Sequence, residues 1–349
     1  MKRIKRLQIS SLLVFFILFG IGSLAFFKTL RADCISVLSS EKNVKEIVAS
    51  FKGDFEKNVP SNDRMNALLY NLTGICNSDQ VIIGIDNWLF YSSKNDGDPI
   101  ADYEGTNDYT DKQLEKAKNN MFNTQKWLEK KGISFCLMVS PNKENVYSKY
   151  MPRKYVQTDV TRTDRLVDYL KQNGINAVNP KDDLLKLSDD FKTYYKYDTH
   201  WNELGAYIGT KCVLNTFKLN IPDADEAIIE EDIKCNEDLV SIAGLDGVFK
   251  PDYGLTTKRI LHNIDEQQLD AQEIYHNHND KAEYNKSILL IGDSFRKAMA
   301  PNLGYIFKDV YVVHRDKYKK EMLDNISPDY LIMEFVERYS NETEDFRIM

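Results

Sequence analysis

The chain has 349 residues, of which 42% are hydrophobic and 28% charged, so it is long and apolar enough to bury a sizeable core. The formal net charge is −7, and because residues 1–31 hold six basic side chains and no acidic one, the remainder carries −13. Such an acidic body should repel nucleic acid, and no nucleic-acid partner is expected.

The start of the chain predicts a membrane segment. Four basic residues precede an apolar stretch from Leu7 to Phe27, long enough to span a bilayer with its N-terminal side in the cytoplasm. For residues 1–31 two alternatives stay open, a signal anchor and a signal peptide cleaved after Ala25. The anchor is favoured because the apolar run continues past that site. Either way, the body is expected outside the cytoplasm, and the anchor would make this a single-pass protein of the cell membrane.

Residues 32–80 are predicted to form a helical stalk, ending in a further short helix and loop at 61–80. Two short apolar runs, 81–84 and 88–91, then flank a turn at Asp86 and Asn87, which is typical of a β-hairpin. Residues 111–131 are expected to form a charged amphipathic helix.

Strands and helices then alternate, with residues 220–285 as a polar, irregular insertion. Strands are expected at 133–139, 175–178, 287–291, 310–313 and 330–335, and helices at 162–173, 202–217 (with Asn202 as N-cap), 295–307 and 317–325. Apolar strands separated by helices predict an α/β fold whose parallel sheet is covered on both faces.

Ser294 is a candidate nucleophile because it follows the apolar run 288–291 and Gly292, where a buried strand turns into a helix. A hydroxyl at that place projects from the carboxyl edge of the sheet, and the N–H groups of the helix start are available to an oxyanion. Gly292 would allow a close backbone approach. The alternative is that Ser294 serves only as an N-cap.

Asp198 and His200 supply the matching acid and base. In an extended segment, residues i and i+2 point to the same face, so the carboxylate can fix the imidazole tautomer and stabilise its protonated form. The alternative is a structural Asp–His contact at a helix entrance. Catalysis is favoured because a serine turn of the right type exists elsewhere in the chain.

No metal site is expected. His276, His278 and Asp280 have suitable side chains, but they fall in a polar stretch that is predicted to be a solvated loop. The five cysteines contain no CxxC pair, and Cys136 is expected to be a buried thiol.

At this point the sequence resembles the DHHW proteins, the alginate O-acetyltransferase-like group of SGNH hydrolase-like acyltransferases. The resemblance covers residues 80–340. It rests on Asp198-Thr199-His200-Trp201, Gly292-Asp293-Ser294-Phe295, Trp88-Leu89-Phe90, Ser140-Pro141-Asn142-Lys143, Glu237-Asp238-Leu239 and the stretch from Glu334 to Arg338.

The resemblance implies an SGNH-like (flavodoxin-like) α/β/α sandwich over residues 81–349, with a circularly permuted order in which the serine comes last. It implies Ser294 as nucleophile, His200 as base and Asp198 as orienting acid. The GxND block of ordinary SGNH enzymes is missing, so Asn142 is the candidate for the second oxyanion donor. Three charged residues are candidates for substrate contact, with salt bridging as the alternative: Arg296, Glu334 and Arg338.

The function expected from this resemblance is O-acetylation of an exopolysaccharide or cell-wall polymer outside the cytoplasm, through an acyl-serine and without a cofactor. The resemblance also implies a multi-pass membrane acyltransferase as the partner that donates the acyl group. Two alternatives stay open: a carbohydrate esterase with the same triad, and a non-catalytic scaffold for polymer export.

Overall fold

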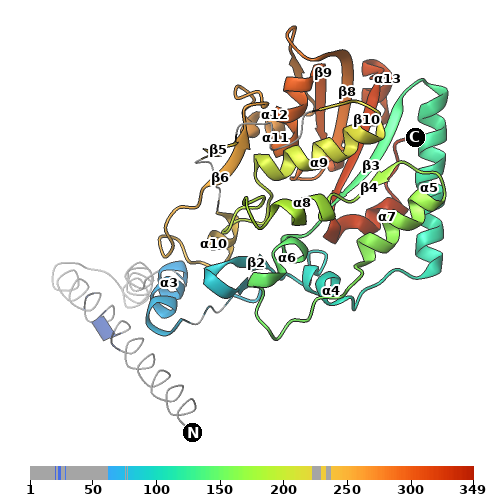
Figure 1. Cartoon of the computed structure of the whole chain (residues 1–349). Helices are drawn as coiled ribbons and strands as arrows, with labels where there is room; N and C mark the ends of the chain where they lie inside the picture. Colours follow the sequence, from blue (N-terminus) through green and yellow to red (C-terminus); the bar gives the residue numbers. More distant parts are fainter. Residues whose placement is uncertain are drawn as a thin grey trace, which may run out of the picture. The chain divides into compact units, whose positions relative to one another are not determined.

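The computed structural model describes residues 62–349 apart from 75, 77, 222–228 and 233–236, together with residues 20, 23, 24 and 28 (Figure 1). The chain divides into two units, residues 1–78 with 240–250 and residues 79–239 with 251–349. Apart from residues 20, 23 and 24, the expected membrane span at 7–27 lies outside the described residues, as does the stalk at 32–60. No helix among the described residues is long and apolar enough to cross a membrane.

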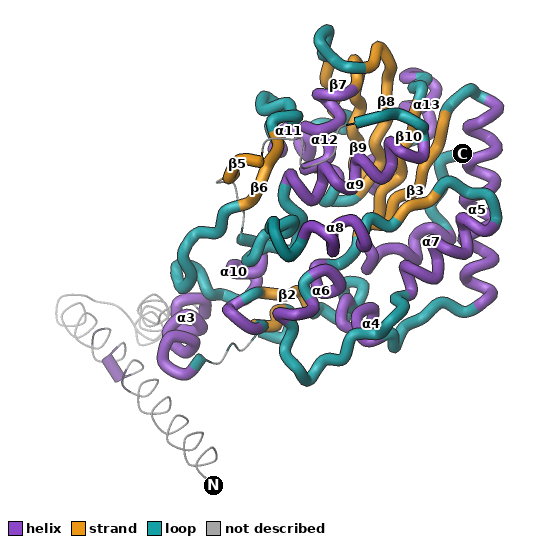
Figure 2. Tube along the Cα trace, in the orientation of Figure 1, coloured by secondary structure: helices purple, strands orange, loops and turns teal. Residues whose placement is uncertain are grey.

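The larger unit is built on a six-stranded sheet with the order β4-β3-β10-β8-β9-β7 (Figure 2). The first five strands are parallel, and β7 joins the edge antiparallel to β9. The strand bounds are β3 (Ser134–Ser140), β4 (Ala177–Val178), β7 (Tyr275–His278), β8 (Tyr284–Gly292), β9 (Phe307–His314) and β10 (Tyr330–Val336).

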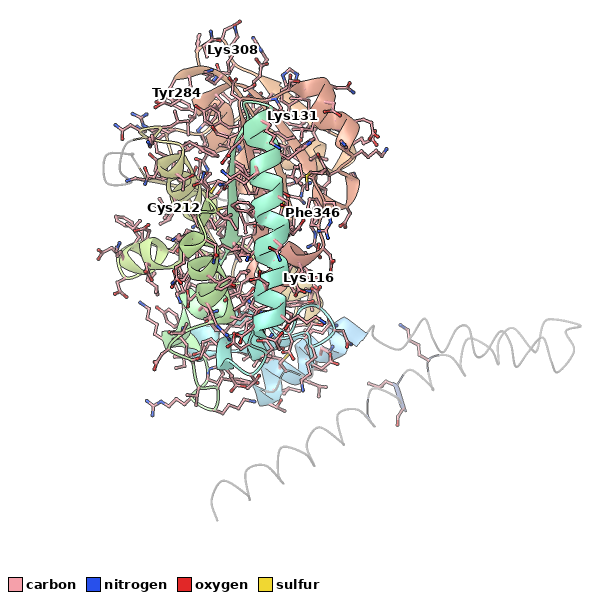
Figure 3. All side chains as sticks on the ribbon, turned by 90° about the vertical axis from the view of Figure 1, so that its right-hand side faces the viewer. Lys116, Lys131, Cys212, Tyr284, Lys308 and Phe346 are labelled. Carbon is pink, nitrogen blue, oxygen red and sulfur yellow. The ribbon has the colours of Figure 1, made fainter. Side chains whose placement is uncertain are left out.

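Helices cover both faces of this sheet. One face packs on α9 (Glu203–Thr216), α11 (Glu266–Ala271) and α12 (Arg296–Ile306), and the other on α5 (Asp111–Lys130), α7 (Arg162–Gln172) and α13 (Lys320–Ile326). Side chains of the central strands alternate between the two cores, as in β3, where Cys136 and Met138 face one core while Phe135 and Leu137 face the other. Figure 3 shows α5, with Lys116 and Lys131 labelled along it, lying lengthwise over one face of the sheet.

Shorter elements complete the described part. They are α3 (Asn62–Thr73) in the smaller unit, then β1 (Val81–Ile83), η1 (Ile85–Asn87), β2 (Leu89–Tyr91), α4 (Pro99–Glu104), α6 (Lys143–Val146), η2 (Ser148–Tyr150), α8 (Lys181–Leu187), β5 (Ile229–Asp232), α10 (Asp238–Ile242), β6 (Gly254–Thr257), η3 (Arg315–Lys317) and η4 (Glu337–Glu344). β1 and β2 form the expected antiparallel hairpin, and both Asp86 and Asn87 in its turn have positive φ. β5 and β6 form a separate antiparallel pair.

The α/β class and the helices on both faces are confirmed. Asn202 caps α9 by accepting from the N–H of Gly205, as expected. Cys136 is buried with a free thiol, and burial raises its pKa to about 12. The prediction of a solvated loop at His276 and His278 was wrong, because these residues lie on β7. That strand is short, polar and half-exposed at the sheet edge, so it carries no apolar run.

Candidate active site

Ser294 lies at the carboxyl edge of the sheet. Strands β3, β10 and β8 are parallel, so their carboxyl ends share one edge, and Ser294 follows the end of β8 by two residues. α12 begins at Arg296, directly beyond it. Strand, turn and helix therefore put the hydroxyl at the positive end of a helix of 11 residues, as the sequence predicted.

The turn is held by the side chain of Asp293. Its Oδ1 accepts from the N–H of Phe295 at 3.0 Å, and its Oδ2 accepts from the N–H of Val336 at 2.7 Å, which ties the turn to the end of β10. Gly292 passes close to Glu334 of β10, since a Cβ at this glycine would lie 2.6 Å from Glu334 Oε2. The expectation of a close approach at Gly292 is confirmed.

Asp198 and His200 lie on a bent loop between Tyr194 and Trp201, two residues that form an antiparallel bridge. The carboxylate of Asp198 accepts from the N–H of His200 at 2.9 Å, an Asx-type turn that closes the bend. The prediction of an extended segment was therefore wrong. The turn nevertheless brings the carboxylate to the imidazole, because the backbone N–H and the ring Nδ1 of His200 both contact Asp198 Oδ1.

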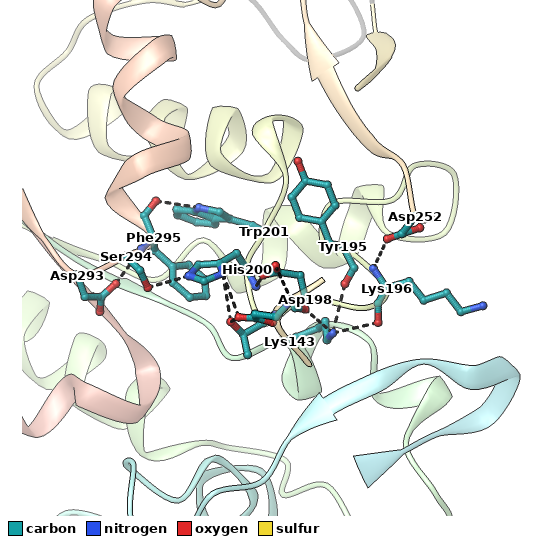
Figure 4. Close-up of polar contacts among 12 residues, drawn as sticks. Lys143, Tyr195, Lys196, Asp198, His200, Trp201, Asp252, Asp293, Ser294 and Phe295 are labelled. Atoms are coloured by element: carbon teal, nitrogen blue, oxygen red, sulfur yellow. Dashed lines mark hydrogen bonds and ion pairs between the residues drawn. The ribbon is translucent and has the colours of Figure 1, made fainter. Parts of the chain in front are cut away.

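The structure brings Ser294, His200 and Asp198 into one hydrogen-bonded row (Figure 4). His200 Nε2 lies 2.7 Å from Ser294 Oγ, and His200 Nδ1 lies 2.6 Å from Asp198 Oδ1. The carboxylate is buried, while the imidazole side chain is 29% exposed. A hydroxyl, a base and a buried acid in this order can generate an oxygen nucleophile.

The pKa values of His200 and Asp198 are shifted in directions that suit proton transfer. Burial lowers the pKa of His200, but the adjacent Asp198 carboxylate outweighs it, and the pKa lies above the ordinary 6.5. Burial raises the pKa of Asp198, and here the charge and hydrogen bonds of His200 outweigh burial, so that it lies below 3.8. Asp198 is thus ionised where His200 titrates, which stabilises the imidazolium formed by proton transfer.

Trp201 connects the histidine loop to the serine turn. Its indole Nε1 donates to the backbone carbonyl of Phe295 at 3.0 Å, and the Phe295 ring packs 5.3 Å from Trp201 and 5.1 Å from His200. A Cβ added to Gly209 of α9 would lie 2.8 Å from the indole, so the tryptophan is packed tightly against that helix. These contacts fix the position of His200 relative to Ser294.

The backbone N–H of Ser294 donates to no hydrogen bond within the described part of the chain. The next three N–H groups are used: Phe295 donates to the Asp293 side chain, Arg296 to the Asp293 carbonyl and Lys297 to the Ser294 carbonyl. The Ser294 N–H is therefore the available donor at the start of α12, adjacent to the hydroxyl whose attack would create an oxyanion.

Asp238 is a site residue that sequence reasoning did not single out. It accepts from the N–H of Thr199 at 2.8 Å and from its hydroxyl at 2.6 Å, and its own N–H donates to Asp198 at 3.2 Å. Its Oδ2 lies 3.6 Å from His200 Nδ1. Burial, then the negative charge of Asp198, raise the pKa of Asp238. The signal was its place in the Glu237-Asp238-Leu239 motif.

Lys143 is a second residue without an assigned role in the sequence. It is 2% exposed, and its ammonium donates to the backbone carbonyls of Asp198 (2.7 Å), Tyr195 (3.2 Å) and Lys196 (3.3 Å). Burial lowers the pKa of Lys143 to about 8, although carboxylates nearby oppose the shift. One buried cation thus holds the loop that carries the acid and the base.

Asn142 is not brought into contact with Ser294. Its backbone N–H donates to Glu337 at 2.9 Å and its side-chain amide donates to Asp102 at 3.1 Å, within a buried network. Asp102 also contacts Arg162, whose Nε lies 2.6 Å from the carboxylate. These bonds assign Asn142 to the support of α6, so the geometry does not favour it as the second oxyanion donor.

Arg296 and Glu334 are fully buried, so neither lines a substrate surface in this structure. Arg296 donates to the backbone carbonyl of Asp293 and pairs with Asp270, both at 2.7 Å. Glu334 accepts from the hydroxyl of Ser140 and the N–H of Asp293. Burial and the negative Asp293 raise the pKa of Glu334. The expectation of substrate contact was wrong for both, because each side chain supports the serine turn from within.

Arg338 is the one of the three charged candidates that reaches solvent, with 8% exposure. Its guanidinium lies over the rings of Phe295 (5.9 Å), Tyr339 (5.0 Å) and Tyr91 (5.5 Å), and its Nε is 3.9 Å from Asp96. Because Phe295 also packs on His200, Arg338 is next to the row of Ser294 and His200 and stays a candidate for substrate contact.

Comparison with known proteins identifies the family. The family model described as "SGNH hydrolase-like domain, acetyltransferase AlgX" matches residues 81–306, which include all three residues of the row. No curated protein matches the chain.

Solved structures share the fold. PatB1 of Bacillus cereus has a TM-score of 0.52 and 14% identity over 76% of this chain and 99% of that one. PatB1 with a sulfonyl adduct has a TM-score of 0.51 and 14% identity, covering 77% and 99%. A DHHW family protein from Eubacterium siraeum has a TM-score of 0.51 and 13% identity, also covering 77% and 99%.

Proposed function

Because this chain belongs to the family of SGNH hydrolase-like, AlgX-type acetyltransferase domains, we propose that it is an extracytoplasmic O-acyltransferase that acetylates an exopolysaccharide or cell-wall polymer. The observation that carries this proposal is the row in which His200 lies 2.7 Å from the Ser294 hydroxyl and 2.6 Å from Asp198. A serine activated in this way is suited to forming an ester intermediate.

In the first half-reaction, His200 Nε2 accepts the proton of Ser294 Oγ as that oxygen attacks the carbonyl carbon of the acyl donor. Asp198 stabilises the resulting imidazolium. The carbonyl oxygen becomes an oxyanion, which the Ser294 N–H and the start of α12 stabilise. When the intermediate collapses, the bond to the donor oxygen breaks, the leaving group takes the proton from His200, and an acyl-serine remains.

In the second half-reaction, a sugar hydroxyl gives its proton to His200 and attacks the acyl-serine carbonyl. The ester bond to Ser294 breaks, its oxygen recovers the proton, and the acetylated sugar leaves. If water took the place of the sugar, the same residues would act as a carbohydrate esterase. The two outcomes therefore differ in acceptor binding and exclusion of water, not in the reacting side chains.

The setting of this reaction rests on the sequence. Basic residues before the apolar stretch 7–27 support a single membrane anchor with the reacting domain outside the cytoplasm. There the acyl group would come from a multi-pass membrane acyltransferase, the partner that the family resemblance implies. The resemblance also implies a permuted, flavodoxin-like SGNH order, with Asp198 and His200 preceding Ser294.

The test supplies the full-length protein, in detergent, with an activated acetyl ester and a panel of neutral, amino-sugar and uronic-acid oligosaccharides. Mass analysis of the products separates acetylated oligosaccharide from free acetate. We expect acetylated oligosaccharide from the wild type and none from Ser294→Ala. Free acetate as the sole product would support the esterase, and equal products from both proteins would exclude a role for Ser294.

A second reagent tests the nucleophile independently of the acceptor. The structure of PatB1 with a sulfonyl adduct suggests a sulfonyl fluoride as the probe. We expect this reagent to modify the wild type once and to inhibit transfer. Ser134→Ala, which changes an exposed serine at the amino end of β3, serves as the matched control and should be modified like the wild type.

A further inference from the structure

A second cluster of reactive side chains lies at the edge of the sheet, away from Ser294. His276 and His278 are alternate residues of β7, so both point to the same face of the strand. Asp309 of β9 is the register partner of His278 and also pairs with Ser287, near the start of β8. Ser294 follows the opposite end of β8. From the rise per residue of a strand, the two clusters are roughly 20 Å apart.

The two imidazoles converge on one carboxylate oxygen. His276 Nε2 lies 2.9 Å and His278 Nδ1 lies 2.8 Å from Asp309 Oδ1. The three ligand atoms all fall within 4.8 Å of one another. Around a tetrahedral zinc ion, with bonds of about 2.0–2.1 Å, ligand atoms stand roughly 3.3 Å apart. If the three ligand atoms moved slightly apart, a zinc ion could therefore replace the two hydrogen bonds.

Neighbouring groups orient the two rings. His278 Nε2 lies 3.1 Å from Asp280, the carboxylate–histidine arrangement that fixes the tautomer of metal-ligating histidines. The ring of His276 stacks on Tyr311 with centroids 4.3 Å apart and an interplanar angle of 5°. Both histidines are nearly half exposed, so an ion has a direct path from solvent.

Charge also favours a cation at this place. Two carboxylates lie beside the histidine pair, because Asp309 contacts both rings and Asp280 contacts His278. The ammonium of Lys308 lies 3.8 Å from Asp280, and Figure 3 labels Lys308 at the top of its view.

We propose that His276, His278 and Asp309 form a binding site for a first-row divalent metal ion, with zinc as the best match to two imidazoles and one carboxylate. Water would fill the remaining position. The ion would join the edge strand β7 to β9, so its effect would be on the stability of this edge and not on the chemistry at Ser294.

The experiment uses the full-length, untagged protein in detergent, stripped of metal and titrated with zinc chloride by calorimetry. We expect one bound zinc per chain, and at least about tenfold weaker binding in His276→Ala, His278→Ala and Asp309→Asn. His262→Ala is the matched control, because it removes a histidine outside the cluster, and it should bind like the wild type. Absence of zinc binding by the wild type would overturn the proposal.

Among the described residues there is one competing cluster, which Asp198, His200 and Asp238 form at the candidate active site. His200→Ala should therefore keep its zinc, and a loss of binding in this variant alone would assign the ion to the other cluster and overturn the proposal. Thermal unfolding adds a readout of folding. Zinc should raise the melting temperature of the wild type and of His200→Ala, each compared with the same protein without zinc, but should leave that of Asp309→Asn unchanged.

Discussion

Lys143 donates to the backbone carbonyl of Asp198 across 2.7 Å, from the start of α6 to the loop that carries the acid and the base. The same ammonium meets the carbonyls of Tyr195 and Lys196. A buried cation with three carbonyl acceptors has no direct role in proton transfer here, because it touches neither Ser294 nor the His200 ring. We infer that Lys143 positions the loop.

Lys143→Met should lower kcat by about 10- to 100-fold with little change in KM, because the loop loses its anchor and the acid–base pair its alignment. Burial of the ammonium is itself unfavourable, so the loss of three hydrogen bonds is partly offset, and the free energy of unfolding should change by no more than about 2 kcal/mol. Steady-state kinetics and urea unfolding measure the two effects. Lys149→Met, at an exposed lysine, is the control, and a wild-type kcat in Lys143→Met would refute the positioning role.

The pH dependence of kcat/KM should report His200. Since neutral His200 is the proposed base, activity should rise with pH through an apparent pKa above 6.5. In Asp198→Asn the burial of the imidazole persists without its counter-charge, so this pKa should move down while the plateau falls by about 10³- to 10⁴-fold. A rising limb that is unchanged in Asp198→Asn would show that another group is being titrated.

The same pair makes a pH-dependent contribution to stability. His200 has a raised pKa in the folded state, so its contribution is complete below pH 6.5 and is lost as pH rises through the folded value. Asp198 has a lowered pKa, so its contribution is present above pH 3.8 and is lost as pH falls through the folded value. The stability difference between wild type and His200→Gln should therefore be largest between these two pH values, as measured by urea unfolding.

Asp238→Asn should reduce kcat by about 10-fold, less than Asp198→Asn, because Asp238 is 3.6 Å from His200 and acts mainly through Thr199. The two variants share contacts, so their effects should not add in the double variant. Asp189→Asn changes an exposed carboxylate and should leave kcat unchanged. Strictly additive effects of Asp198→Asn and Asp238→Asn would indicate that the two carboxylates act independently.

Gly292→Ala should destabilise the fold by about 1–3 kcal/mol, because the added methyl group would lie 2.6 Å from Glu334 Oε2. Urea unfolding measures the change. Truncating the opposing side chain in Gly292→Ala/Glu334→Ala should relieve part of the contact, so the double variant should lose less stability than the sum of the single ones. If the losses simply add, the close approach at Gly292 is not the cause.

The central sheet and its helices could be predicted because their signals are local. Strands β3, β8 and β10 are buried apolar runs, and the ends of α5, α7 and α9 fall within a residue or so of the expected positions. Ser294, His200 and Asp198 could be found because a strand-to-helix turn and a short acid–base segment are visible in the sequence. The contact between His200 and Ser294 joins residues 94 positions apart, so the sequence shows only that the contact is possible and not that it forms.

What the sequence missed depends on tertiary contacts. A lysine is ordinarily exposed, so nothing marked Lys143 as buried under a loop more than 50 residues away. Arg296 is adjacent to Ser294 in sequence, but the first turn of α12 directs it inward to Asp293 and Asp270. The bend at Asp198 was missed because an Asx turn and an extended strand both place residues i and i+2 together.

The most direct measurement is intact mass spectrometry of the full-length protein in detergent after brief exposure to an activated acetyl ester. We predict a single acetyl adduct on the wild type and on Ser134→Ala, and none on Ser294→Ala or His200→Ala. An adduct that persists in Ser294→Ala, or a wild type that neither forms an adduct nor turns over the ester, would contradict the acyl-serine route.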